Sequence, residues 1–107
     1  MATKSRLEQI EAMLTDDPRD PELRYMLAME HASAGDDAAA VRCFQELIAI
    51  TPKYPPAYHM AGRALQRLNR SAEARTLLTQ GIAIAQQQGD HHAAGEMAEL
   101  LQSLEAA

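Results

Sequence analysis

Two pairs of side chains in this sequence of 107 residues have the chemistry that a catalytic or metal site needs. In the first pair, His31 and Cys43 flank a predicted turn almost symmetrically, so an antiparallel helical hairpin would bring them near each other. A histidine beside a cysteine can take its proton and leave a nucleophilic thiolate. However, both side chains are expected to face the helix interface, and no third group that would orient the histidine is evident. We therefore favour Cys43 as a small apolar core residue.

In the second pair, His92 and Glu96 are four residues apart, so they share one face of a helix and could bind a metal ion together. Two ligands are too few for a structural zinc site, and the ring of the adjacent His91 would diverge from that of His92. The chain has no glycine-rich phosphate loop and no serine nucleophile motif. We therefore predict no catalytic residue, no metal site and no cofactor, and we expect that the protein is not an enzyme.

The composition argues against other classes of function. The chain has 15 acidic and 10 basic residues, and its formal net charge of −5 disfavours a general nucleic-acid-binding protein. A single cysteine rules out an internal disulfide and fits a reducing compartment. The start of the chain lacks the apolar core of a signal peptide, and no apolar run approaches the length of a membrane span. We expect a cytoplasmic protein that does not insert into membranes.

The elements that would position these groups are helices. Alanine, leucine and methionine dominate the apolar residues, whereas aromatic and β-branched residues are scarce, and this bias favours helix over sheet. The first helix is predicted over 5–16, where Ser5 and Glu8 form a capping box. Gly35 and Asn69 can adopt the left-handed conformation that ends a helix, so they mark two turns. The other predicted helix starts are Asp20-Pro21, Asp36 or Asp37, Pro55-Pro56, Ser71 and Asp90.

One helix-turn-helix pattern occurs twice in the central part of the chain, at 21–54 and at 55–88, with a period of 34 residues. Small residues recur at this step, and they would allow the two helices of a pair to approach closely. Larger residues that recur at the same step would fill the space between successive pairs. The matched positions are Ala28 and Gly62, Ala40 and Ala74, Phe44 and Leu78, and Pro18 and Pro52.

Two further predicted helices flank the repeats. The segment 5–16 corresponds to the second helix of a repeat whose first helix is missing, because Pro18 lies one period before Pro52. A last helix over 90–105 carries apolar residues on one face and polar residues on the other. A terminal helix with one polar face is what an open-ended stack of repeats needs.

At these residues the chain resembles the tetratricopeptide repeat family. The signature positions of that family hold Leu27, Ala28, Gly35, Ala40, Phe44 and Pro52 in the first copy, and Ala61, Gly62, Ala74 and Leu78 in the second. The resemblance implies an all-α fold, a right-handed α-α superhelix that forms one domain over 1–107. Two full repeats would lie between an N-terminal half-repeat helix and a C-terminal capping helix.

The chain departs from the family pattern at three positions. The frequent tyrosine of the family is His31 in the first copy and Leu65 in the second. The frequent tryptophan of the family is Arg24 in the first copy and Tyr58 in the second. The second copy also has Gln86 where the first copy has its closing proline, so the second helix of that copy is expected to run about a turn longer.

The resemblance further implies that the first helices of successive pairs line a concave groove, which binds a peptide or an amphipathic helix of a partner protein. Carried onto this sequence, the groove would contain Glu22, Tyr25, Met29, His59, Arg63 and Gln66, with Ala93 and Glu96 near one end. Alternatively, Tyr25 and Met29 pack against neighbouring helices. Arg63 and Arg67 could attract an acidic ligand, although a solvated charged face is the favoured interpretation.

Some members of the family hold the C-terminal carboxylate of a partner with a lysine and an asparagine. The corresponding inward positions are Tyr25 and Met29 here, so the resemblance does not extend to this clamp. We therefore predict a protein–protein interaction module or scaffold without catalysis. Two alternatives stay open: self-assembly into a homo-oligomer through the helical ends or the grooves, and a regulatory appendage of a larger complex.

Overall fold

The computed structural model describes residues 4–106, and in this range the chain forms six α-helices and no strand. The helices are α1 (Arg6–Asp16), α2 (Pro21–Ser33), α3 (Asp37–Ile50), α4 (Pro55–Arg67), α5 (Ser71–Gln87) and α6 (His91–Ala106). The predicted all-α fold is confirmed. The ends of the predicted domain, residues 1–3 and 107, lie outside the described range. None of the helices within 4–106 combines the length and the apolar character that a membrane span requires.

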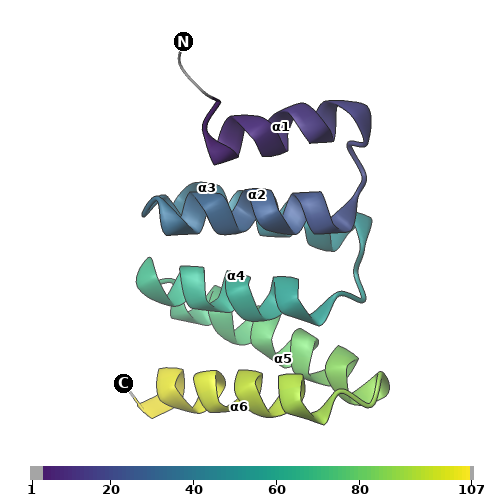
Figure 1. The fold of residues 1–107 in the computed structure, drawn as a ribbon. Helices are drawn as coiled ribbons and strands as arrows, with labels where there is room; N and C mark the ends of the chain where they lie inside the picture. The colour runs from purple at the N-terminus through teal and green to yellow at the C-terminus, as the bar shows by residue number, and fades with distance from the viewer. Residues whose placement is uncertain (1–3, 107) are drawn as a thin grey trace.

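The helices are stacked in one direction, from α1 at one end of the molecule to α6 at the other (Figure 1). Helices α2 and α3 form one hairpin, α4 and α5 form a second, and α6 packs on α5. The two hairpins meet mainly through α3 and α4, and α1 packs on α2. The described chain measures 50 × 29 × 20 Å, so it is elongated along the stack. This layered arrangement is that of a helical-repeat protein.

Four helices begin at a side-chain cap that the sequence predicts. The hydroxyl of Ser5 accepts a hydrogen bond from the backbone N–H of Glu8 at 3.1 Å and donates one to the Glu8 carboxylate, also at 3.1 Å. The carboxylates of Asp20, Asp36 and Asp90 each accept from the backbone N–H three residues further on, at 3.1 Å. These bonds satisfy N–H groups that have no carbonyl partner within the helix.

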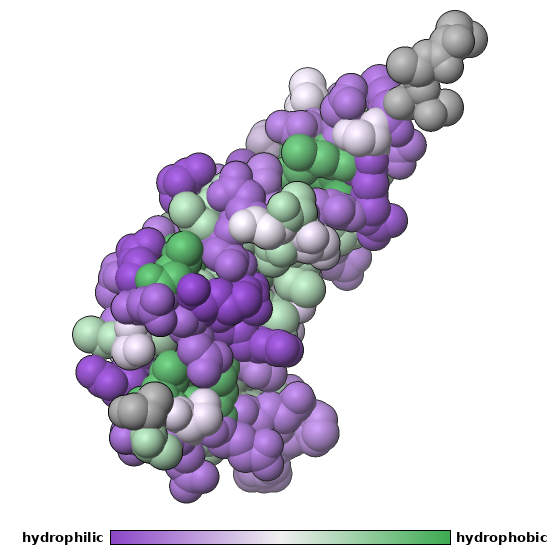
Figure 2. Space-filling view, turned by 90° about the vertical axis from the view of Figure 1, so that its left-hand side faces the viewer, coloured by the Kyte–Doolittle hydropathy of each residue, from purple (hydrophilic) through white to green (hydrophobic). Residues whose placement is uncertain are grey.

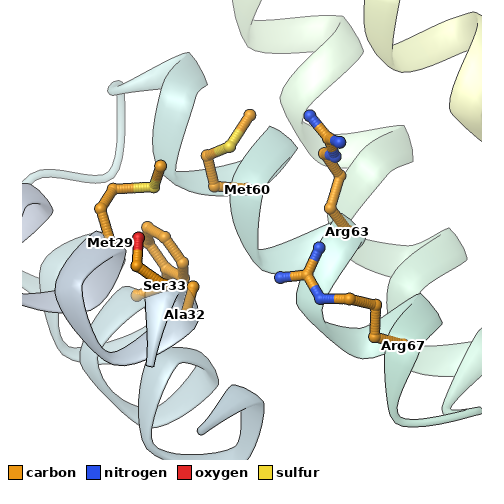
Figure 3. A pocket seen from close by; sticks show the side chains of 7 residues that line it. Met29, Ala32, Ser33, Met60, Arg63 and Arg67 are labelled. Atoms are coloured by element: carbon orange, nitrogen blue, oxygen red, sulfur yellow. The ribbon is translucent and has the colours of Figure 1, made fainter. Parts of the chain in front are cut away.

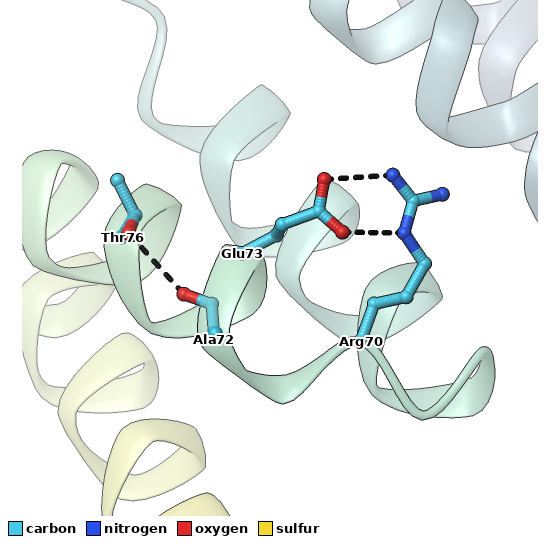
Figure 4. Close-up of polar contacts among 4 residues, drawn as sticks. All are labelled: Arg70, Ala72, Glu73 and Thr76. Carbon is cyan, nitrogen blue, oxygen red and sulfur yellow. Dashed lines mark hydrogen bonds and ion pairs between the residues drawn. The ribbon is translucent and has the colours of Figure 1, made fainter.

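The start of α5 corrects one prediction. Ser71 does not cap this helix, because it is the first helical residue and the N-cap position belongs to Arg70, whose side chain makes no capping bond. Instead, the Arg70 guanidinium donates to both oxygens of the Glu73 carboxylate, from Nε at 2.5 Å and from Nη2 at 2.7 Å (Figure 4). Glu73 lies in the first turn of the helix, where a negative charge is favoured by the helix dipole.

Three helices end in the same backbone motif. Gly35, Asn69 and Gly89 have positive φ angles of 83°, 59° and 75°. The residue after each of them donates a backbone hydrogen bond to a carbonyl five residues earlier; for example, Asp36 N–H donates to His31 O at 2.9 Å. This is the Schellman arrangement, which satisfies the last carbonyls of a helix and requires the left-handed conformation. The predicted turns at Gly35 and Asn69 therefore form as expected.

Small residues lie where the two helices of a hairpin cross. Ala28 and Gly62 are buried, and a Cβ atom placed on Gly62 would lie 2.7 Å from Cδ2 of Leu78. The side chains of Phe44 and Leu78 are fully buried between the layers. Helix α5 has 17 residues and its counterpart α3 has 14, in agreement with the expectation that the missing proline lets α5 continue.

A side chain from the first helix of each repeat anchors the linker that precedes it. In the first repeat, Nε of Arg24 donates to the carbonyl oxygen of Pro18 at 2.7 Å. In the second repeat, the hydroxyl of Tyr58 donates to the carbonyl oxygen of Pro52 at 2.6 Å. Both donors and both acceptors are 34 residues apart, so two different residue types make the same contact at matched positions.

Candidate binding groove

An open hollow of about 360 Å³ lies between α2 and α4, over the side chain of Phe44 from α3. Its walls are Met29, Ala32 and Ser33 from α2 and Met60, Arg63 and Arg67 from α4. Figure 3 shows the two thioether side chains, one from each helix, and the two guanidinium groups that follow along α4. Methionine side chains are flexible and polarisable, so this hollow can adapt to apolar groups of different shapes.

The two arginines of this hollow are in different electrostatic situations. Arg67 forms an ion pair with Asp37 at the start of α3, with an Nη2–Oδ1 distance of 2.8 Å, and its Nε donates to the same oxygen at 2.9 Å. Arg63 is exposed and forms no ion pair with any residue in 4–106. The positive charge of Arg63 is therefore available to a ligand, whereas that of Arg67 is already balanced.

A second hollow, of about 380 Å³, lies between α4 and α6. Helix α4 contributes His59, Arg63 and Gln66, and α6 contributes Glu96, Glu99, Leu100 and Ser103. Because Arg63 lines both hollows, they adjoin at this residue, and together they extend across α2, α4 and α6. We call this surface the α2–α4–α6 groove. Across it the lining changes from apolar at α2 to positive at Arg63 and then to negative at α6.

His59 lies at the side of the groove nearer α6. Its pKa is lowered from the ordinary value, mainly because partial burial disfavours the charged imidazolium. The nearby positive charge of Arg63 lowers the pKa further, and the carboxylate of Glu96 opposes the shift. The lowered pKa favours the uncharged imidazole at neutral pH, so the local charge of this side comes from Arg63 and the two glutamates.

The structure brings together four of the six residues predicted for the groove. Met29 and Arg63 line the first hollow, and His59, Arg63 and Gln66 line the second. Of the two residues expected near one end, Glu96 lines the second hollow, whereas Ala93 packs against the core.

Tyr25 and Glu22 line neither hollow. The ring of Tyr25 makes edge-to-face contacts with Phe44 and Tyr54, at centroid distances of 6.0 and 5.7 Å. Partial burial, and to a smaller extent the neighbouring Tyr54, raise the pKa of Tyr25. Tyr25 therefore packs where α2, α3 and the start of α4 meet, as the alternative interpretation of this residue holds. Glu22 is exposed in the first turn of α2 and acts on Tyr54, whose pKa it helps to raise after the larger effect of burial.

Met60 and Arg67 also line the first hollow; Met60 was not predicted there, and Arg67 was predicted only as a residue that could attract an acidic ligand. The signal that identifies both is a stripe along α4: Met60, Arg63 and Arg67 are three and four residues apart, so their side chains lie on one helix face. His59 and Gln66 lie on the adjoining stripe, which faces α6.

The environment of Cys43 disfavours a reactive thiol in the first of the two candidate pairs. Burial and the carboxylate of Glu46 raise the pKa of the Cys43 thiol, in that order of size, and a raised pKa disfavours a thiolate. Cys43 packs beside the cluster that contains Phe44. His92 Nε2 lies 2.9 Å from a carboxylate oxygen of Glu96, and no group of three or more potential metal ligands gathers within 4–106.

The stacked hairpins, with a hollowed face across their first helices, define a helical-repeat protein. A sequence model described as tetratricopeptide repeat matches residues 31–100. A TPR repeat-containing protein of Pseudomonas aeruginosa is 33% identical to this chain over 101 residues, which are 94% of this chain and 96% of that protein. The chain therefore belongs to the tetratricopeptide repeat family.

Solved structures agree with this assignment. The crystal structure of a tetratricopeptide repeat domain protein from Salinibacter ruber is similar with a TM-score of 0.76 and 31% identity, covering 81% of this chain and 97% of that one. A solution structure of a Bordetella parapertussis protein has a TM-score of 0.85 and 28% identity, covering 97% of this chain and 90% of that one. The tetratricopeptide repeat fold is generally a protein–protein interaction module, and the family typically serves as a non-catalytic scaffold.

Proposed function

We propose that this chain is a non-catalytic interaction module that binds a peptide segment of a partner protein in the α2–α4–α6 groove. The observation that carries the proposal is the hollow between α2 and α4, in which two methionines present apolar surface above the buried ring of Phe44. Beside them lies Arg63, which forms no ion pair within 4–106. Its volume of about 360 Å³ is that of a site for a few side chains. Methionine and arginine are also enriched at recognition surfaces.

Two other surface features within 4–106 offer a ligand less contact than this groove does. On the face shown in Figure 2, the surface is largely hydrophilic, and apolar groups gather in separate patches along the stack. A third hollow is lined only by residues of one helix, α5, with polar side chains such as Thr76 and Gln80. A peptide bound in the α2–α4–α6 groove would instead contact three helices, which gives both buried area and a defined orientation.

The proposal is tested by selecting peptides for the intact protein from a random library displayed on phage, and by mapping the bound peptide with backbone amide chemical shifts. We expect selected peptides to shift amides of α2, α4 and α6. The double substitution Met29→Ala/Met60→Ala should weaken binding on the order of tenfold, about 1.4 kcal/mol, because it removes the apolar walls. Gln80→Ala, on the outer face of α5, is the matched control and should bind as the wild type does. Shifts confined to α5 would place binding elsewhere.

Self-association is the second candidate function, and one observation favours it. Met13 is 45% exposed on α1, and it is the one large apolar side chain with this degree of exposure within 4–106. Helix α1, which carries Met13, forms one end of the described stack (Figure 1). Sedimentation velocity over a dilution series tests this candidate: a dimer that Met13→Gln dissociates would support it, and a monomer at every concentration would remove it.

A further inference from the structure

We propose that the α2–α4–α6 groove selects a partner segment in which an apolar residue, an acidic residue and a basic residue follow one another across the three helices. This inference rests on the proposed peptide-binding function and specifies the chemistry of its ligand. It follows from the order of the lining groups. The apolar methionines of α2 and α4 come first, Arg63 stands where the two hollows adjoin, and Glu96 and Glu99 lie on α6.

The apolar position of the ligand is set by the walls of the first hollow. Met29 and Met60 reach it from facing helices, and the buried ring of Phe44 forms part of its lining. A peptide side chain placed there would remove apolar surface on both sides from water. Ser33 and Ala32, on the same stretch of α2, are small and leave the hollow open to an aliphatic or aromatic group.

The acidic position is set by the difference between the two arginines. Arg67 is engaged by Asp37, so a ligand carboxylate near it would compete with an existing ion pair. Arg63 has no such partner within 4–106 and borders both hollows. A carboxylate that follows the apolar residue of the ligand would meet Arg63, and arginine can bind a carboxylate through two parallel hydrogen bonds.

The basic position is set by α6. Glu96 and Glu99 line the far side of the second hollow, and His59 adds little positive charge there because its pKa is lowered. A lysine or arginine of the ligand would therefore be favoured near these carboxylates. Glu99 forms no ion pair within 4–106, whereas Glu96 already lies 2.9 Å from Nε2 of His92. Packed helices lie about 8–10 Å apart and an extended chain advances about 3.3 Å per residue, so consecutive ligand positions are separated by roughly three residues.

The net charge of the whole chain does not predict this pattern. A formal charge of −5 attracts basic ligands from a distance, without regard to position. Preference for an acidic residue at one position is a local effect of Arg63, and added salt screens both effects. The discriminating property is therefore the order of charges within the ligand and not the net charge of the ligand.

The experiment selects peptides from the same random phage library with four proteins: the wild type, Arg63→Glu, the double variant Glu96→Lys/Glu99→Lys, and the control Arg75→Glu. Arg75 is an exposed arginine on the outer face of α5, so the control makes the same charge reversal away from the groove. All four sites are exposed, and circular dichroism verifies that each variant is folded.

We expect the wild type and Arg75→Glu to select peptides in which an acidic residue lies between an apolar residue and a basic one. Arg63→Glu should replace the acidic preference with a basic one at that position and weaken wild-type peptides on the order of tenfold. The α6 variant should replace the basic preference with an acidic one. An unchanged consensus in Arg63→Glu would overturn the inference, while loss of binding in Met29→Ala/Met60→Ala would still uphold the proposed function. If no peptide is enriched over a blank surface, both proposals are overturned.

Discussion

Tyr58 and Gly81 share one space between α4 and α5. A Cβ atom added to Gly81 would lie 2.6 Å from Cβ of Tyr58, a distance that no pair of packed carbon atoms adopts. The matched positions of the first repeat hold Arg24 and Leu47. There the fully buried Leu47 fills the space, and Arg24 extends to the linker and to the carboxylate of Glu46. The matched space is therefore filled by Leu47 in the first repeat and by Tyr58 beside a glycine in the second.

Substitution of Gly81 by alanine should destabilise the fold. The added methyl group meets Cβ of Tyr58, which cannot move without the α4 backbone, and Sδ of Met97, which can. Overpacking of this kind costs about 1–3 kcal/mol, measured as the free energy of unfolding in urea. Gly95→Ala is the control, because a Cβ there has no neighbour within 4 Å, and it should stabilise α6 by up to about 1 kcal/mol. Equal effects of both substitutions would contradict the packing described for Gly81.

Larger changes at the hairpin crossings should lower the melting temperature clearly. Gly62→Leu forces a side chain into the space of Leu78, and Ala40→Glu places a charge at a fully buried position. Each should cost on the order of 1–3 kcal/mol or more. A melting temperature within about a degree of the wild type for both would mean that the register of the repeats is wrong.

Asn69 should tolerate glycine better than alanine. Its φ angle of 59° is strained for a residue with a Cβ atom and no local polar group. Asn69→Ala should lower the free energy of unfolding by about 1 kcal/mol, whereas Asn69→Gly should change it little or raise it. Urea denaturation of the two variants in parallel checks this order. The reverse order would show that the Asn69 side chain, and not the backbone conformation, stabilises the turn.

Acidification should weaken the fold through His59. Its pKa is lowered in the folded protein, so below the ordinary histidine value of about 6.5 the unfolded chain binds the proton more readily. The contribution of His59 to stability is complete above that pH and is lost as the pH falls through the folded pKa. His59→Gln should therefore reduce the loss of stability between about pH 8 and about pH 5, measured by urea denaturation. An identical pH dependence in the variant and the wild type would rule out this role.

The thiol of Cys43 should react slowly and should not be needed for binding. Its pKa is raised mainly by burial, so little thiolate is present at neutral pH. Alkylation by iodoacetamide should be slower than that of a cysteine in an unstructured peptide. Cys43→Ser should destabilise less than Gly62→Leu and should leave the affinity for selected peptides unchanged. A fast reaction, or a loss of affinity in the serine variant, would reopen a functional role for the thiol.

The helix starts and ends could be predicted well because they depend on local sequence. Asp20, Asp36 and Asp90 cap their helices with their own carboxylates, and Gly35 and Asn69 close turns through their own φ angles. Ser71 is the exception, because its position in the helix is set by the turn that precedes it. The Schellman turn at Asn69 uses the N–H of Arg70, so Arg70 takes the N-cap position and Ser71 enters the helix.

The groove was harder to predict because it depends on contacts between hairpins. Periodicity placed Met29 and Tyr25 on one helix face, but only the structure separates them: Tyr25 packs on Phe44 and Tyr54, and Met29 borders the open hollow. The difference in charge pairing between Arg63 and Arg67 also depends on tertiary contacts, because the partner of Arg67 is Asp37, thirty residues earlier in the chain. No pattern within α4 distinguishes the two arginines.

The anchoring of the linkers by Arg24 and Tyr58 bears on the elasticity of the whole stack. Each donor lies in the helix that follows a linker and donates a hydrogen bond to the carbonyl of the proline in that linker. One side chain, in addition to the backbone, therefore connects consecutive layers at each of these linkers. Truncation of a single donor should loosen one linker and leave the hydrogen bond to the other linker intact, so the stiffness of the stack depends on each linker separately. Loosening one linker would then change the curvature of the stack without any change in the residues that line the α2–α4–α6 groove.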